Sequence, residues 1–215
     1  MCGAEAWRRG SRWSDPRGAR RRGVRALEGR GYTANNAVDV IDCATHTYRG
    51  SISGLEAVAG ALVCEEQDLV FTSNRGENTV GIFPAEQEAA LVKVKVGPRP
   101  NGLAYDPGRG LVVAANVGDP SRPGSFSISV VDVGAQAMVA DIPVAGRTRW
   151  AVFDAEIGWF YVNIADPPQI AIVESGNPDH VARTFPVAAR PARDGPGCGD
   201  PEAVLRVRRQ GDRRA

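Results

Sequence analysis

Two loops of the sequence carry the residue types best suited to binding a charged ligand. Arg99 and Asn101 lie in the first loop, and Arg147, Arg149 and Trp150 lie in the second, 48 residues further along. A guanidinium group binds a carboxylate or a phosphate through paired hydrogen bonds, and an asparagine amide can add a donor. We therefore predict that these five residues bind a small anionic ligand. The alternative is that the arginines pack on Trp150 and pair with neighbouring acids.

Patterns for catalysis are sparse. The chain has 2 histidines, His46 and His180, both in expected turns, and it contains no nucleophile motif such as G-x-S-x-G. The 4 cysteines, Cys64 among them, are scattered without zinc-ligand spacing, which predicts small buried or terminal thiols and no disulfide framework. We predict no catalytic residue, no metal site and no cofactor.

Several asparagines and aspartates lie near the ends of expected strands, where oxygen ligands for Ca²⁺ could gather. The alternative is that they make hydrogen bonds at turns and strand ends, and we favour it. These residues are Asn101, Asn116, Asn163, Asp106, Asp154 and Asp166.

A repeated pattern must position the two arginine loops. One alternating apolar segment occurs four times, at 38–42, 80–84, 128–132 and 170–174, with offsets of 42, 48 and 42 residues. Other apolar segments keep the same offsets, and Gly, Pro, Asn and Asp separate them. A period of about 40 to 50 residues with four short strands is typical of propeller blades.

The repeat predicts three complete sets of four strands and half of another. The first set is expected at 60–64, 69–74, 79–83 and 91–96. The second is expected at 102–105, 111–116, 126–132 and 139–144, and the third at 150–153, 159–163, 169–174 and 181–187. The two strands at 37–42 and 47–53 correspond to the outer half of a blade. The continuous apolar run of 111–113 indicates an inner strand buried on both faces.

Three segments resemble the blade signature of the YVTN-repeat β-propeller family, a superfamily that includes lactonase-like propellers. They are Asn78–Ile82, Gly97–Asp106 and Tyr161–Ile164. The resemblance implies an all-β fold, here a partial propeller of about three and a half four-stranded blades. It also implies that the two arginine loops lie at the mouth of the axial channel.

The resemblance favours a binding or interaction scaffold, because members of this family serve in binding and in surface and periplasmic roles. Some relatives carry out lactone or quinone-linked chemistry, so one alternative is the remnant of a lactonase-like or quinone-dependent dehydrogenase-like enzyme. Another is a non-functional fragment, because closed propellers need at least about four blades and this chain is predicted to be a truncated copy. An open arc leaves apolar faces uncovered, which predicts self-association or a protein partner that completes the ring.

The charge is unevenly distributed along the chain. Residues 1–30 carry +6, residues 31–190 contain the acidic propeller segment, and residues 191–215 are again rich in Arg, although the net charge is only +1. We predict disordered termini at 1–30 and 191–215 around a blade region at 31–190. No recognition motif accompanies the basic termini, and Gly and Pro interrupt any amphipathic face, so we predict neither nucleic-acid nor membrane binding. No signal peptide is readable, which favours the cytoplasm by default, although the family resemblance also implies exported relatives.

Overall fold

A computed structural model describes residues 23–24, 36–42, 47–85 and 90–187 of the chain. Its labelled elements are all β-strands, in four antiparallel sheets, as predicted for an all-β fold. Within these residues no helix is long and apolar enough to cross a membrane. The basic termini predicted to be disordered fall outside the described ranges, except that Gly23–Val24 form the short strand β1.

Three of the sheets have four strands in sequence order. The first contains β4 (Val58–Cys64), β5 (Leu69–Asn74), β6 (Thr79–Pro84) and β7 (Val92–Lys95). The second contains β8 (Pro100–Asp106), β9 (Leu111–Asn116), β10 (Ser127–Asp132) and β11 (Ala137–Pro143). The third contains β12 (Thr148–Asp154), β13 (Trp159–Ala165), β14 (Pro168–Glu174) and β15 (Arg183–Pro186). Each strand agrees with its predicted position to within two residues.

The fourth sheet has three strands in the order β1, β2 (Val38–Asp42) and β3 (Thr47–Ile52). Strands β2 and β3 are the predicted outer pair of a further blade. Strand β1 was not predicted, and it pairs with β2 where the second strand of a complete blade would lie.

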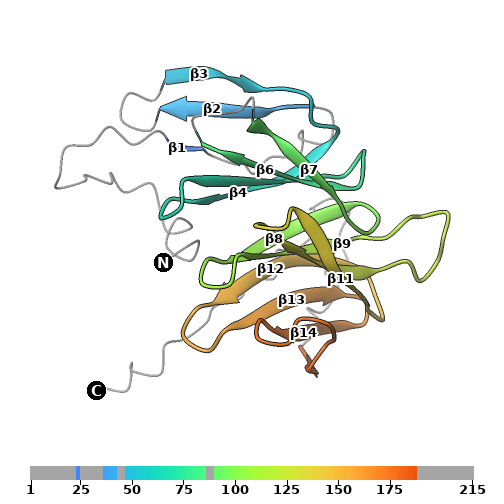
Figure 1. Ribbon diagram of the computed structural model, residues 1–215. Coiled ribbons are helices and arrows are strands. Elements are labelled where there is room, and N and C mark those ends of the chain that lie inside the picture. Colours follow the sequence, from blue (N-terminus) through green and yellow to red (C-terminus); the bar gives the residue numbers. More distant parts are fainter. Residues whose placement is uncertain (1–22, 25–35, 43–46, 86–89, 188–215) are drawn as a thin grey trace, which may run out of the picture.

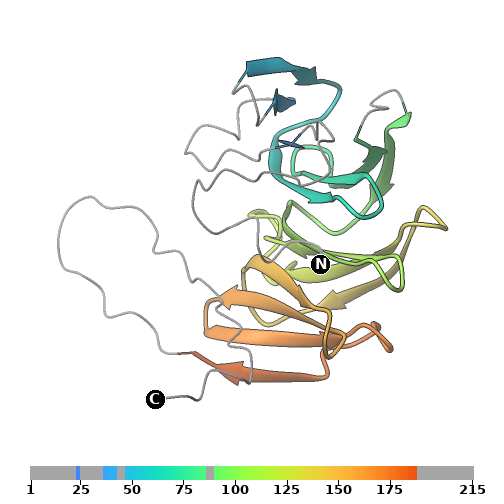
Figure 2. The ribbon, with the colours of Figure 1, turned by 90° about the vertical axis from the view of Figure 1, so that its left-hand side faces the viewer.

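The four sheets stack face to face along an arc, from the sheet of β2 and β3 at one end to the sheet of β12 to β15 at the other (Figures 1 and 2). Three apolar clusters fill the spaces between successive sheets. Phe83, Phe71 and Phe160 are the largest fully buried side chains in these clusters, and each is at most 1% exposed. Burying a side chain of this size contributes about 1.5 to 3 kcal/mol, so the stacking of the sheets stabilises the arc.

Burial follows strand order within a sheet. All six residues of β9 are buried, whereas most of β11 is exposed. The prediction that 111–113 lies on an inner strand buried on both faces is therefore confirmed. Burial decreases toward the outer edge because an outer strand has solvent on one side.

The turn before the second strand has the same backbone conformation in each of the three four-stranded sheets. Asp68, Gly110 and Gly158 precede the second strand of their sheets, and all three have left-handed φ values of 54°, 65° and 71°. Gly adopts this conformation at no steric cost, and Asp tolerates it better than most residues. The Gly, Asn and Asp residues that separated the predicted strands thus supply turn geometry.

Cys64 differs from the prediction. It lies at the end of β4, is fully buried and is disulfide-bonded, so the expectation of a free thiol is wrong for this residue. The other cysteines and His46 fall outside the described residues. Cysteine spacing along a chain does not reveal which thiols the fold brings together.

Candidate functional site

Arg75 occupies the turn that follows β5. Its backbone N–H donates to the carbonyl of Ala57 at 3.1 Å, and the next residue, Gly76, donates to Glu56 at 2.9 Å. These bonds fasten the turn to the segment that enters β4. The Arg75 side chain is therefore presented from a fixed backbone on the inner side of the first four-stranded sheet.

Arg99 lies in the loop that enters β8. It has a left-handed φ of 57°, its N–H donates to Asn78 Oδ1 at 2.8 Å, and its carbonyl accepts from Val117 N–H at 3.0 Å. The loop is thus tied to two neighbouring turns. A non-glycine residue in this conformation is uncommon, and it is often found where a site constrains the backbone.

Asn101 connects the two arginine loops. Its side chain is buried, Oδ1 accepts a hydrogen bond from the Arg75 guanidinium, and Nδ2 donates to the Arg149 carbonyl at 2.9 Å. One amide therefore joins the ends of β5, β8 and β12, which belong to three successive sheets. Of the residues predicted from the sequence, Arg99, Asn101 and Arg149 are brought together here.

The three arginines repel one another. Burial lowers the pKa of Arg75 below its usual range, and the charges of Arg99 and then Arg149 lower it further. Arg75 Nε is buried without a hydrogen-bond partner. Among the described residues, no carboxylate lies within ion-pair distance of Arg75 or Arg99. Arg75 and Arg99 thus hold two positive charges close together with no ion-pair partner among the described residues.

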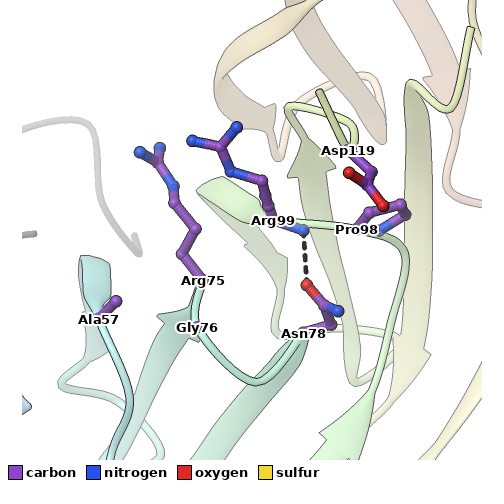
Figure 3. A pocket seen from close by; sticks show the side chains of 7 residues that line it. All are labelled: Ala57, Arg75, Gly76, Asn78, Pro98, Arg99 and Asp119. Atoms are coloured by element: carbon purple, nitrogen blue, oxygen red, sulfur yellow. Dashed lines mark hydrogen bonds between the residues drawn. The ribbon is translucent and has the colours of Figure 1, made fainter. Parts of the chain in front are cut away.

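An open pocket of about 400 Å³ lies beside these side chains. Figure 3 shows the guanidinium groups of Arg75 and Arg99 extending in the same direction from opposite sides of it. Asp119 also lines the pocket, but its carboxylate pairs with Arg122 at 3.1 Å and accepts from Ser121. Those hydrogen bonds lower the pKa of Asp119, so it stays ionised and engaged away from the two arginines.

Comparison with known proteins identifies the architecture. No protein-family model matches the chain, and no curated protein matches it either. Hydrazine synthase from Kuenenia stuttgartiensis is similar in structure with a TM-score of 0.62 at 14% identity. The dihydro-heme d1 dehydrogenase NirN has a TM-score of 0.58 at 19% identity, and a chain of the mitotic checkpoint complex has 0.56 at 13%. These neighbours are β-propeller proteins.

The fold is a partial β-propeller. The matches cover 71%, 73% and 70% of this chain but only 43%, 34% and 44% of the neighbours, so the chain spans less than half the length of these propellers. Identities this low establish the fold alone. The four sheets are the blades, β4, β8 and β12 are the innermost strands, and the arginine cluster lies where these strands begin.

Two predicted site residues lie apart from the pocket of the propeller. Arg147 is exposed, and its carbonyl accepts from Ala165 N–H at 2.8 Å. Trp150 is 37% exposed on the inner strand of the third four-stranded blade. Neither residue lines the pocket beside Arg75 and Arg99. Asn101 and Arg149 do not line it either, so Arg99 is the one predicted residue among its lining.

Arg75 is the residue that sequence reasoning missed. Its equivalents one and two repeats later are Val117 and Ala165, so the repeat does not mark this position as polar. The one feature of the sequence that could have pointed to Arg75 is its place directly after Asn74, in a turn at the same end of the propeller as the Arg99 loop. This position indicates a contact with Arg99 only once the arrangement of the blades around a common axis is known.

Four of the six strand-end amides and acids, namely Asn101, Asn116, Asp106 and Asp154, make the side-chain hydrogen bonds that the alternative to calcium binding predicted. Asn116 Nδ2 donates to Ser127 and Ser129, and Asp106 accepts from the backbone of Gly108 and from the hydroxyl of Ser175 in the next blade. In the described part of the chain, no group of three His, Cys, Asp or Glu residues could hold a metal ion. His180 lies exposed in a turn beside Asp179, as predicted.

Proposed function

We propose that this partial propeller is a binding scaffold of the YVTN-repeat type that holds a small anionic ligand on Arg75, Arg99 and Arg149. The observation that carries the proposal is the charge of the cluster. The guanidinium groups of Arg75 and Arg99 have no carboxylate partner among the described residues, and burial, followed by the charges of Arg99 and Arg149, lowers the pKa of Arg75.

An anion would relieve this repulsion. Like charges held together are costly, and a bound carboxylate or phosphate adds charge-assisted hydrogen bonds to Nε and Nη donors, which are among the stronger hydrogen bonds. The buried Nε of Arg75 is a donor that needs such a partner. One Arg75 Nη already donates to Asn101 Oδ1, so the guanidinium is oriented before a ligand arrives.

The pocket is compatible with a ligand of modest size. It is open to solvent, it has a volume of about 400 Å³, and Pro98, Ala57 and Gly76 supply apolar or neutral surface beside the arginines. We infer a ligand with a compact anionic group that enters first and a small neutral part that contacts these residues.

The proposal is tested by measuring thermal unfolding of the full chain with inorganic phosphate, and with chloride at the same ionic strength. A ligand that binds only the folded state raises the melting temperature, and the rise grows with the logarithm of the ligand concentration above the dissociation constant. We expect phosphate to stabilise the wild-type protein more than chloride does, and this difference to disappear in the double variant Arg75→Gln, Arg99→Gln. Arg109→Gln is the matched control, because Arg109 pairs with Asp106 in another turn. An equal response of the double variant and the wild type to phosphate contradicts the proposal.

A further inference from the structure

The third four-stranded blade ends the described arc, and the face it turns away from the second blade is rich in aromatic side chains. Ala151, Phe160 and Val162 pack toward the second blade, so the alternation of the strands places their neighbours on the opposite face. We call this opposite surface the end face. It is formed by Trp150, Trp159, Tyr161, Ile172, Arg183 and Phe185.

The repeat indicates that such a face is normally covered. Tyr161 and Ile172 correspond to Val113 and Val130 of the second blade, and both valines are fully buried against the third blade. On the end face, Trp150 is 37% exposed and Phe185 is 39% exposed, whereas Ile172 is only 3% exposed. Arg183 lies over the Trp159 ring at 5.1 Å, which leaves a cation at the rim of the aromatic surface.

A polar atom on the end face also lacks the partner that the repeat provides elsewhere. In the first four-stranded blade, Ser73 donates a hydrogen bond to the Asn101 carbonyl of the following blade at 2.7 Å. In the third four-stranded blade, Asn163 occupies the position equivalent to Ser73, and its Oδ1 is buried without a hydrogen-bond partner. An N–H or O–H donor on a following sheet would satisfy this oxygen.

Trp150 specifies what kind of sheet can follow. Its equivalents are Gly60 and Gly102, and a Cβ on Gly102 would lie 2.6 Å from the Arg149 carbonyl of the next inner strand. A tryptophan in this place excludes a close innermost strand. The sheet of β1, β2 and β3 meets this requirement, because in the described residues it has no strand on the inner side of β1.

That same sheet lies at the opposite end of the arc, and among the described residues no further sheet packs on its outer face (Figure 1). Val38 and Ile52 point toward the first four-stranded blade, whereas Tyr48, Ser51 and Asp39 are joined by hydrogen bonds on the other side. Tyr48 is 64% exposed. This start face, defined by Asp39, Tyr48 and Ser51, offers an aromatic ring and an acid to the aromatic rings and Arg183 of the end face.

We propose that the end face docks on the start face of a second copy of this chain, head to tail, so that two copies close one ring. Each copy contributes four sheets, and eight sheets are within the range of about four to eight blades seen in closed propellers. The chain covers 43% and 44% of two solved propeller chains, which is the share expected if two copies build one ring. The two junctions are related by a two-fold axis, so the assembly is closed.

The test is the mass of the full chain in solution, measured by sedimentation over a range of concentrations. We expect a dimer of twice 22.8 kDa. Phe185→Glu on the end face and Tyr48→Glu on the start face should each weaken dimerisation by at least about tenfold, because each places a charge in both junctions. Val139→Glu is the matched control, since Val139 is 53% exposed on the outer strand β11 of the second blade.

Mixing the two variants distinguishes this arrangement from other dimers. The wild-type end face of the Tyr48→Glu chain and the wild-type start face of the Phe185→Glu chain still form one junction, so the mixture should contain a heterodimer although each variant alone is monomeric. Circular dichroism and thermal melting check that each variant folds, and Phe185→Ser and Tyr48→Ser replace any glutamate variant that does not.

The proposal is overturned if the wild-type chain is still monomeric at about 100 µM, because any dimer affinity would then lie beyond the range of specific association. It is also overturned if Val139→Glu loses the dimer to the same extent as the two face variants, or if Tyr48→Glu leaves the dimer intact. The fourth such outcome is a mixture of the two variants that contains no heterodimer. Anion binding at Arg75 does not enter this experiment, so its result is independent of the proposed function.

Discussion

Arg75, after strand β5, donates a hydrogen bond to Oδ1 of Asn101, near the start of strand β8, and so joins two successive blades. The same asparagine donates from Nδ2 to the Arg149 carbonyl of the third blade at 2.9 Å. A single buried amide therefore sets where the Arg75 guanidinium lies relative to the backbone that carries Arg149. The charge cluster depends on this amide for its geometry.

Replacing Asn101 by alanine should weaken both the fold and the site. The change removes two hydrogen bonds, one from the Arg75 guanidinium and one to the part-buried Arg149 carbonyl, and this loss costs about 1 to 3 kcal/mol. We expect the urea midpoint to fall and the extra stabilisation by phosphate to shrink, because Arg75 is no longer held in place. Unchanged urea unfolding together with an unchanged phosphate response would show that Asn101 does not organise the site.

Gly102→Ala should destabilise the packing of β8 against β12. A Cβ at Gly102 would lie 2.6 Å from both the Arg149 carbonyl and Trp150 Cα, so the backbones must move apart. Overpacking of this kind costs about 1 to 3 kcal/mol, measured as the free energy of unfolding in urea. Gly134→Ala is the control, because its Cβ would meet only Asp132 Oδ1 at 3.5 Å. Equal stability of the two variants would contradict the close approach of the inner strands.

Phe160→Ala tests the core between the second and third blades. Phe160 is fully buried, and its ring lies 4.7 Å from that of Phe153. Truncation should cost about 3 to 5 kcal/mol, through lost burial and the cavity left behind. Ile157→Ala, in a turn where the side chain is 51% exposed, should change the free energy of unfolding by less than about 1 kcal/mol. If the two losses were similar, the third blade would not be packed on the second.

Stability should fall at alkaline pH, in part through Tyr105. Burial and then the Asp106 carboxylate raise the pKa of this phenol, and the hydrogen bond to Gln67 offsets part of the rise. A raised pKa in the folded state means that the stabilisation is complete below the unfolded value of about 10 and is lost as the pH rises above it. Tyr105→Phe should flatten the decline of unfolding free energy between about pH 9 and 11. A decline as steep as that of the wild type would show that Tyr105 is not the responsible group.

Much of the fold could be predicted from the sequence, because a blade is a local structure. Its four strands are consecutive, each pairs with the next, and the turns between them are short. Alternating apolar residues and turn residues such as Gly110 and Gly158 therefore predicted every strand of the three complete blades. Strand β1 escaped prediction because a two-residue strand of Gly and Val has no periodic pattern.

The site could be predicted only in part. Arg99 and Asn101 were found because the loops that enter inner strands lie at one end of any propeller. Arg75 and the bond state of Cys64 were not, since neither position carries a repeat signal and both depend on contacts between distant segments.

The sequence alone determined which residues form strands and turns, because period-two alternation and turn chemistry act within a few residues. Only the tertiary structure decided that Arg75, Arg99 and Arg149 share one region of charge. These residues stand in different blades, and their interaction depends on how the inner strands approach each other at Gly60 and Gly102. That approach is set by packing between blades, which the spacing of residues along the chain does not encode.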